Sequence, residues 1–173
     1  MKLIENFLPD EMHKGICDII WGRNFTWLNE TTDINDNNNI YCPKVIDFNA
    51  KVKQQHYLFT LEPEKRFSPF FDQVMFPIMG KLEFTSIQRA WVNNYFYYPE
   101  RTKYVFHTDE RYPHTVYLYN LNTCDGYTEF ESGEKFSSKA NSMLVFDGSK
   151  KHRPVTQTDS PMRTNINIVV LNV

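Results

Sequence analysis

The sequence has few cysteines and almost no net charge. Its 173 residues include three cysteines, Cys17, Cys42 and Cys124, which are widely spaced and form no C-x-x-C pair. This spacing argues against a disulfide framework and a thiolate zinc site, and it indicates a reducing compartment. Nineteen basic and twenty-one acidic side chains leave a formal charge of −2. No sequence-wide field therefore draws the chain onto nucleic acid or an anionic membrane.

Apolar stretches long enough to cross a membrane are also missing. The first twenty residues carry Glu5, Asp10, Glu11 and Lys14 within what would have to be the apolar core of a signal peptide. No later run approaches the eighteen or so apolar residues of a membrane-spanning helix. We therefore expect a cytoplasmic protein with no membrane partner.

Internal repeats and long Pro/Gly/Ser linkers are absent, whereas aromatic residues are plentiful. Hydrophobic residues make up 41% of the chain and aromatic residues 16%, which is too rich in large rings for a disordered segment. A chain of this length can bury a full hydrophobic core without disulfide bonds or structural metal ions. We predict one domain over residues 1–173, in which 1–84 provide helical and loop supports and 85–173 form a stranded core.

Two stretches of the front half have helical signals. Residues 9–20 and 68–79 each begin with proline and acidic or serine start signals and continue with an apolar stripe. Pro77 lies inside the second stripe and predicts a kink there. Both helices are expected to lie against the outside of a sheet. The polar stretch 29–43 between them is predicted to be a loop, either a lid over a substrate or a simple connector.

Short β-rich runs follow from residue 85 onward, and turn residues separate them. Such runs, preceded by helices, predict an all-β core with flanking helices, arranged as an antiparallel sandwich or jelly roll. The predicted strands cover residues 86–97, 103–107, 114–121, 127–130, 142–147, 151–156 and 163–172.

The segment YVFHTDE at 104–110 contains the residues that point to chemistry. In a strand, alternation puts His107 and Asp109 on the same face, and His152 follows 43 residues after Asp109. Two imidazoles and one carboxylate leave coordination positions open, as a ferrous ion that binds a co-substrate and dioxygen requires. An H-x-D pair alone is common by chance. Arg163, at the start of the final strand, strengthens the case for a functional site, because a guanidinium is costly to bury without a carboxylate partner.

Together these residues resemble the 2-oxoglutarate and Fe(II)-dependent dioxygenases, in the prolyl 4-hydroxylase-like branch common among small bacterial and phage-encoded proteins. The resemblance covers about residues 86–172 and rests on HTD at 107–109, DGYTEF at 125–130, NSMLVFD at 141–147, His152 and Arg163. It implies a cupin-like double-stranded β-helix and iron held by His107, Asp109 and His152. It also implies that Arg163 pairs with the distal carboxylate of 2-oxoglutarate. Many prolyl hydroxylases carry Lys there, and Asp125 replaces the first glycine of the family's G-G-x-T-x-F.

The resemblance also suggests further polar contacts to the co-substrate. Asn93 and Tyr95 resemble an N-x-Y pair that some relatives use. Asn165 stands where certain relatives carry a serine that touches the distal carboxylate. Parity with the strand-borne ligands predicts that Tyr117 faces inward. For each of these residues, a structural role as a hydrogen-bonded lining of the barrel is the alternative.

The family implies an enzyme that uses Fe(II), 2-oxoglutarate and O2, with ascorbate as a candidate reductant, to hydroxylate a C–H bond. Peptidyl proline is the first substrate class to test, so a peptide or protein would be the partner. One alternative is a catalytically inactive, metal-binding jelly roll that serves as an interaction module. Another is a zinc-dependent hydrolase in which activated water attacks the substrate, and this reading gives Arg163 no necessary role.

Overall fold

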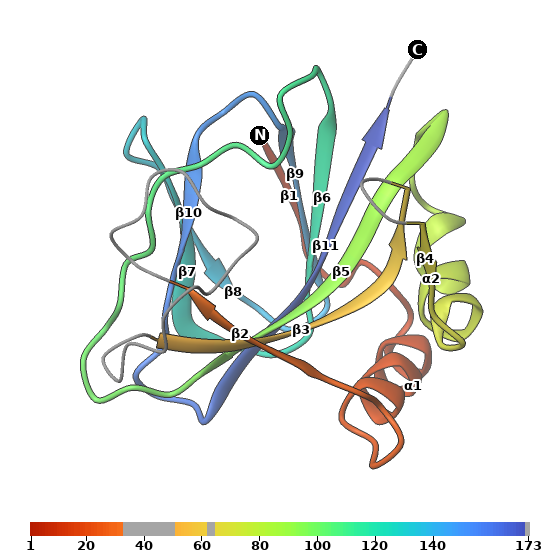
Figure 1. Cartoon of the computed structure of the whole chain (residues 1–173), viewed down its shortest axis with the longest axis horizontal. Coiled ribbons are helices and arrows are strands. Elements are labelled where there is room, and N and C mark those ends of the chain that lie inside the picture. The colour runs from red at the N-terminus through yellow and green to blue at the C-terminus, as the bar shows by residue number, and fades with distance from the viewer. Residues whose placement is uncertain (33–50, 62–64, 172–173) are drawn as a thin grey trace.

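The computed structural model describes residues 1–32, 51–61 and 65–171, which form two antiparallel β-sheets and two helices (Figure 1). The larger sheet has the strand order β1-β9-β6-β11-β5-β3-β2, with β4 paired to β3, and the smaller sheet has the order β10-β7-β8. The larger sheet consists of β1 (Lys2–Ile4), β2 (Leu28–Thr32), β3 (Lys51–Thr60), β4 (Arg66–Phe67), β5 (Ser86–Phe96), β6 (Thr115–Asn120), β9 (Ser142–Asp147) and β11 (Met162–Leu171). The smaller sheet consists of β7 (Cys124–Phe130), β8 (Lys135–Ser138) and β10 (His152–Val155).

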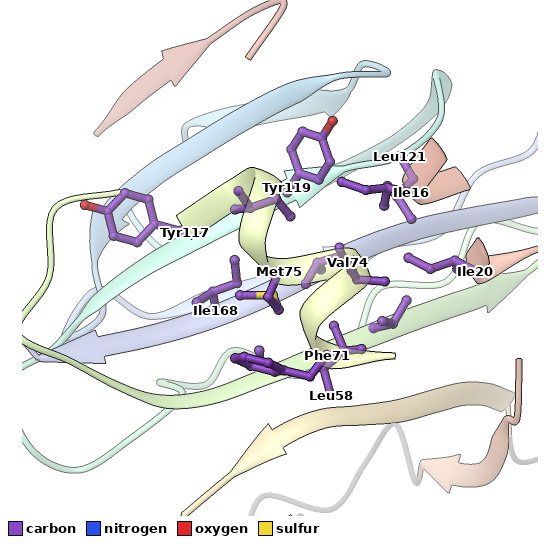
Figure 2. Packing of buried hydrophobic residues seen from close by; sticks show 14 of the residues in the cluster. Ile16, Ile20, Leu58, Phe71, Val74, Met75, Tyr117, Tyr119, Leu121 and Ile168 are labelled. Atoms are coloured by element: carbon purple, nitrogen blue, oxygen red, sulfur yellow. The ribbon is translucent and has the colours of Figure 1, made fainter. Parts of the chain in front are cut away.

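The larger sheet separates two apolar layers. The helices α1 (Asp10–Ile20) and α2 (Phe71–Met79) lie on one side of it, and the smaller sheet lies on the other (Figure 1). On the helix side, Ile20 and Met75 pack in one buried cluster with Ile168 of β11 (Figure 2). On the opposite side, Val169 of β11 packs in a second cluster with Phe130 of the smaller sheet. The predicted β core with helices outside is therefore confirmed.

Both predicted helices are present. α1 begins directly after Pro9 and has Asp10 and Glu11 in its first turn, where carboxylates interact favourably with the helix dipole. α2 begins three residues later than the serine signal, and Pro77 lies inside it. The kink expected at Pro77 stays a prediction. In the part of the chain that the structure describes, neither helix is long and apolar enough to span a membrane.

The front half contains strands that the sequence did not predict. β3 runs over ten residues, and its site-facing positions include the polar residues Lys53 and Gln55, so an alternating apolar pattern is hard to see. Residues 28–32 form β2, which pairs with β3. The prediction of a loop at 29–43 is therefore wrong for residues 29–32, whose backbone completes the sheet, and residues 33–43 lie outside the described residues.

The strand predicted at 103–107 is also absent. This segment forms only two isolated backbone bridges, Lys103 with Val155 and His107 with His152. The register shifts by one residue between these bridges, and Pro154 of β10 lies between them. Because proline has no N–H to donate, it interrupts the ladder at this point. The segment therefore follows β10 without becoming a regular strand.

Candidate metal and co-substrate site

His107 and His152 face each other across a backbone pair. His107 donates its N–H to the carbonyl of His152 at 3.0 Å, and His152 returns a bond to the carbonyl of His107 at 2.9 Å. Side chains of residues opposed in this way project to the same side. Their ring centroids are 4.8 Å apart. The backbone pair between the two segments thus holds the two imidazoles together. The alternation of side chains along a single strand plays no part in this.

Asp109, two residues after His107, completes a cluster of three. One nitrogen or oxygen atom from each of these side chains lies within 4.8 Å of the others. Asp109 Oδ2 is 3.5 Å from His152 Nε2. Asn167 of β11 donates its amide to both oxygens of Asp109, at 3.3 and 3.4 Å, and Arg89 of β5 forms an ion pair with Oδ1. The carboxylate is therefore held from the sheet side.

Backbone carbonyls orient both imidazole rings. Nδ1 of His107 lies 3.1 Å from the carbonyl oxygen of Val105, and Nδ1 of His152 lies 3.1 Å from that of Lys150. A carbonyl can only accept, so each Nδ1 carries the proton and donates it. Each Nε2 is left free of this bond. A histidine that binds a metal through Nε2 is commonly anchored by the protein through Nδ1 in this way.

The protonation states of the cluster suit metal binding. Burial, with a further contribution from His152, lowers the pKa of His107 to about 4. Burial alone would raise the pKa of Asp109, but the charge of Arg89 and the two nearby histidines outweigh it and hold this pKa at about 2. At neutral pH His107 is therefore neutral and Asp109 ionised. These are the forms that bind metal ions.

A row of polar side chains lies on the same face of the larger sheet as this cluster. The register of β11 and β5 sets Arg163 opposite Tyr95 and Asn165 opposite Asn93. Directly opposed residues share a face, and so do residues two apart on one strand, so Asn167 belongs to the same row. Asn93 donates its amide to Asn165 Oδ1 at 3.2 Å. The structure thus brings three of the four softer candidates, Asn93, Tyr95 and Asn165, beside Arg163.

Arg163 is a buried cation with no carboxylate partner among the residues that the structure describes. It is 1% exposed, and burial lowers its pKa. Its Nη2 donates to Thr128 Oγ1 at 2.9 Å and its Nη1 to the carbonyl of Tyr127 at 3.2 Å. The guanidinium carbon lies 5.7 Å from the ring centroid of Tyr95. Among the described residues, no acidic side chain forms a salt bridge with Arg163, and its Nε has no hydrogen-bond partner.

Comparison with known proteins finds other proteins with the same fold. No protein-family model and no curated protein sequence matches the chain. Among solved structures, the chain matches a prolyl hydroxylase from Trichoplax adhaerens, in complex with a hypoxia inducible factor oxygen degradation domain peptide fragment. The TM-score is 0.65 at 14% identity, over 99% of this chain and 83% of that one. The chain therefore shares its fold with that protein.

Two further structures agree with this fold. A prolyl-4-hydroxylase from Pseudomonas putida matches with a TM-score of 0.54 at 12% identity, over 99% of this chain and 92% of that one. An oxidoreductase of the 2OG-Fe(II) oxygenase family from Burkholderia pseudomallei matches with a TM-score of 0.50 at 13% identity, over 68% of this chain and 66% of that one. The predicted jelly roll and the resemblance to prolyl hydroxylases are therefore confirmed at the level of fold.

Tyr117 lies on the opposite side of the larger sheet from the candidate site. It is paired with Ile168 and packs in the helix-side cluster, and its hydroxyl donates to the carbonyl of Glu83 at 3.0 Å (Figure 2). The prediction that Tyr117 faces inward is wrong. Its parity was counted from residues 107 and 109, and these do not belong to a regular strand in register with β6.

Sequence reasoning missed two side chains that hold the carboxylate of Asp109, namely Arg89 and Asn167. A usable signal was present, because Arg89 continues the alternation of Asn93 and Tyr95 along β5, and Asn167 follows Asn165 by two residues on β11. It also missed Thr128, in the DGYTEF motif, which accepts a hydrogen bond from Arg163. Alternate residues along β5 and β11, which lie on one face of the sheet, therefore included site residues that the motifs alone did not identify.

Gly126 provides the space in which Arg163 lies, and its substitution by alanine should disturb this position. A Cβ at Gly126 would lie 2.9 Å from Arg163 Cδ and 3.1 Å from the backbone nitrogen of Gln157. Overpacking of this kind costs about 1–3 kcal/mol, which corresponds to a fall of roughly 2–12 °C in melting temperature for a protein of this size. We expect Gly126→Ala to melt at a lower temperature than the wild type in calorimetry.

The matched control is Gly15→Ala. Gly15 lies in α1 and has no atom within 4 Å of an added Cβ, so alanine there should raise helix stability by up to about 1 kcal/mol. A Gly126→Ala protein that melts at or above the wild-type temperature would contradict the close approach of Arg163.

Proposed function

We propose that the chain is an Fe(II)- and 2-oxoglutarate-dependent dioxygenase that hydroxylates a C–H bond. The observation that carries this proposal is Arg163, a buried cation to which the described residues offer no salt-bridge partner. A buried charge without a counter-charge is costly, so a fold that retains one is expected to receive an anion there. The fork of a guanidinium matches a carboxylate.

The metal of the proposed site would be held by His107, Asp109 and His152. The two imidazoles and the carboxylate form the two-His-one-carboxylate set typical of non-haem Fe(II) oxygenases. The anchored Nδ1 atoms and the carboxylate bonded by Asn167 supply the orientation that such ligands need. With iron and 2-oxoglutarate bound, such a site couples oxidative decarboxylation of the oxo acid to hydroxylation of a substrate by O2.

The polar row on the sheet supports a co-substrate that spans Arg163 and the metal. Along β11, Asn165 lies between Arg163 and Asn167, and Asn167 contacts Asp109. Asn93 and Asn165 supply amide groups between the two ends of the row. We assign Arg163 to the distal carboxylate, with Tyr95, Asn93 and Asn165 lining the co-substrate.

Peptidyl proline is the substrate class that we propose first. The structure from Trichoplax adhaerens is of a prolyl hydroxylase in complex with a peptide fragment, and the present chain matches it over 99% of its length. A peptide substrate is consistent with this likeness. A zinc hydrolase would leave Arg163 without a function, and an inactive interaction module would leave a buried charge that serves no ligand.

The proposal is tested by anaerobic titration of the Fe(II)-loaded protein with 2-oxoglutarate. A 2-oxo acid that chelates ferrous iron is expected to produce a visible charge-transfer band, whereas succinate, which lacks the 2-oxo group, should produce none. Admission of O2 together with peptides that contain proline should then release succinate, measured with and without ascorbate. No band at saturating 2-oxoglutarate would refute the oxygenase, and hydrolysis that needs zinc but not O2 would favour the hydrolase.

A further inference from the structure

Arg89 is a second buried arginine, and its surroundings differ from those of Arg163. It is 7% exposed and lies on β5 with its guanidinium carbon 4.1 Å from the ring centroid of Trp91. Its Nη2 donates to Asp109 Oδ1, and its Nη1 lies 3.2 Å from Glu110 Oε1. Arg89 therefore has counter-charges among the described residues, whereas Arg163 has none there.

These contacts divide the two oxygens of Asp109 between different neighbours. Oδ1 accepts from Arg89, whereas Oδ2 lies 3.5 Å from His152 Nε2. Asn167 donates to both oxygens from the sheet. A carboxylate bonded in this way cannot rotate freely about its χ2 angle. Oδ2 is therefore the oxygen that lies near His152, and Oδ1 the one that Arg89 holds.

Arg89 lies at the opposite end of the polar row from Arg163. The register sets Arg163 opposite Tyr95 and Arg89 opposite Val169, so the two arginines are separated by the length of the row. Six residues separate Tyr95 from Arg89 on β5, which at strand spacing is roughly 20 Å. The carboxylate of a co-substrate that reaches Arg163 is therefore out of reach of Arg89.

We propose that Arg89 is a positioning residue that holds Asp109 with a single oxygen directed at the metal. It acts through Asp109, and it lies out of reach of the carboxylate that Arg163 would hold. This inference rests on the metal site of the proposed function, but it requires neither 2-oxoglutarate nor O2.

Two effects of Arg89 on metal binding oppose each other. Its positive charge repels a divalent cation, but Glu110 also pairs with Arg89 and offsets that charge. Its hydrogen bond orients a carboxylate that must bind the metal, and loss of such an outer partner typically weakens metal affinity 10- to 100-fold. Because the repulsion is compensated and the orientation is not, we expect the loss of Arg89 to weaken metal binding.

The test is the anaerobic affinity of the metal-free full chain for Mn(II), measured from the electron paramagnetic resonance signal of free Mn(II). Arg89→Met keeps the apolar stem over Trp91 and removes the charge and the donors. We expect at least about tenfold weaker binding for this variant. Arg89→Lys restores one charged donor and should recover most of the affinity, which a loss of packing alone would not allow.

Arg66→Met is the matched control, because Arg66 also lies over a ring, that of Tyr57, at 4.8 Å and forms no ion pair with Asp109 among the described residues. Its Mn(II) affinity should stay within about twofold of wild type.

Unchanged or tighter binding by Arg89→Met, or equal weakening in Arg89→Lys and Arg89→Met, overturns the proposal. If Arg89→Met does not fold, as judged by its metal-free melting curve, Arg89→Gln takes its place under the same criteria. A wild-type chain that binds no Mn(II) refutes the metal site itself, which distinguishes the two failures.

Discussion

Replacement of Arg163 by methionine is expected to weaken 2-oxoglutarate binding strongly without destabilising the metal-free protein. Truncation of one partner of a buried charge pair costs about 2–5 kcal/mol, which is roughly 30-fold to a few thousandfold in affinity. In the absence of ligand, however, the described residues give Arg163 no counter-charge, so an apolar side chain of similar length should leave stability equal or higher. Calorimetry of the metal-free protein and titration with 2-oxoglutarate measure both effects.

Two variants sharpen this prediction. Arg163→Lys keeps the charge but loses the fork, so its affinity should fall between those of wild type and Arg163→Met. Arg101→Met removes an arginine that pairs with Asp125 at the surface, and it should change the affinity for 2-oxoglutarate by less than about twofold. Unchanged affinity in Arg163→Met, or a large loss of stability in that variant, would assign Arg163 a purely structural role.

Removal of His107 is expected to abolish metal binding. A metal that binds only the folded state stabilises it by about 2.7 kcal/mol at a concentration of 100 times Kd, which is roughly 5–11 °C in melting temperature. We expect Mn(II) to raise the melting temperature of the wild type by this amount, and to have no effect on His107→Ala. Turnover of 2-oxoglutarate to succinate should also be lost.

His114 offers a close control for this experiment. It is buried, and its Nδ1 lies 2.7 Å from the carbonyl of Tyr112, two residues earlier, as the Nδ1 atoms of His107 and His152 lie near carbonyls two residues before them. It does not belong to the three-residue cluster. His114→Gln should therefore keep the full shift with Mn(II). Loss of the shift in this control, or its persistence in His107→Ala, would remove the support for the cluster as the metal site.

Much of the fold could be predicted from the sequence because local signals and burial agreed there. The strand at 142–147 was predicted at the residues where it occurs, since SMLVFD has few polar residues and buries most of its length. β3 could not be predicted, because several of its inward positions, such as Lys53 and Gln55, face polar groups of the site and therefore look like surface residues.

The candidate site was predicted for a reason that the structure does not support. Alternation along a strand was expected to join His107 and Asp109, but no regular strand forms there. A backbone pair joins His107 to His152, and Arg89 and Asn167 hold Asp109. The correct ligands were found from the spacing of His107, Asp109 and His152 in the sequence. The same false strand gave the wrong orientation for Tyr117. The candidates that lie on regular strands, Asn93, Tyr95 and Asn165, do come together on one face of the sheet. Their roles stay predictions.

The interruption of the ladder at Pro154 affects how firmly the segment with His107 and Asp109 is attached to the barrel. The segment that carries His107 and Asp109 is joined to β10 by two isolated bridges, whereas β11 is paired along both edges. Segments with few backbone bonds open locally at a lower free energy than the central strands beside them. Opening of this segment breaks the two bridges and the bonds of Asp109 to Arg89 and Asn167, but leaves the pairing of β11 intact. Exchange of a metal ion at the proposed site would then require only this local opening, and not global unfolding.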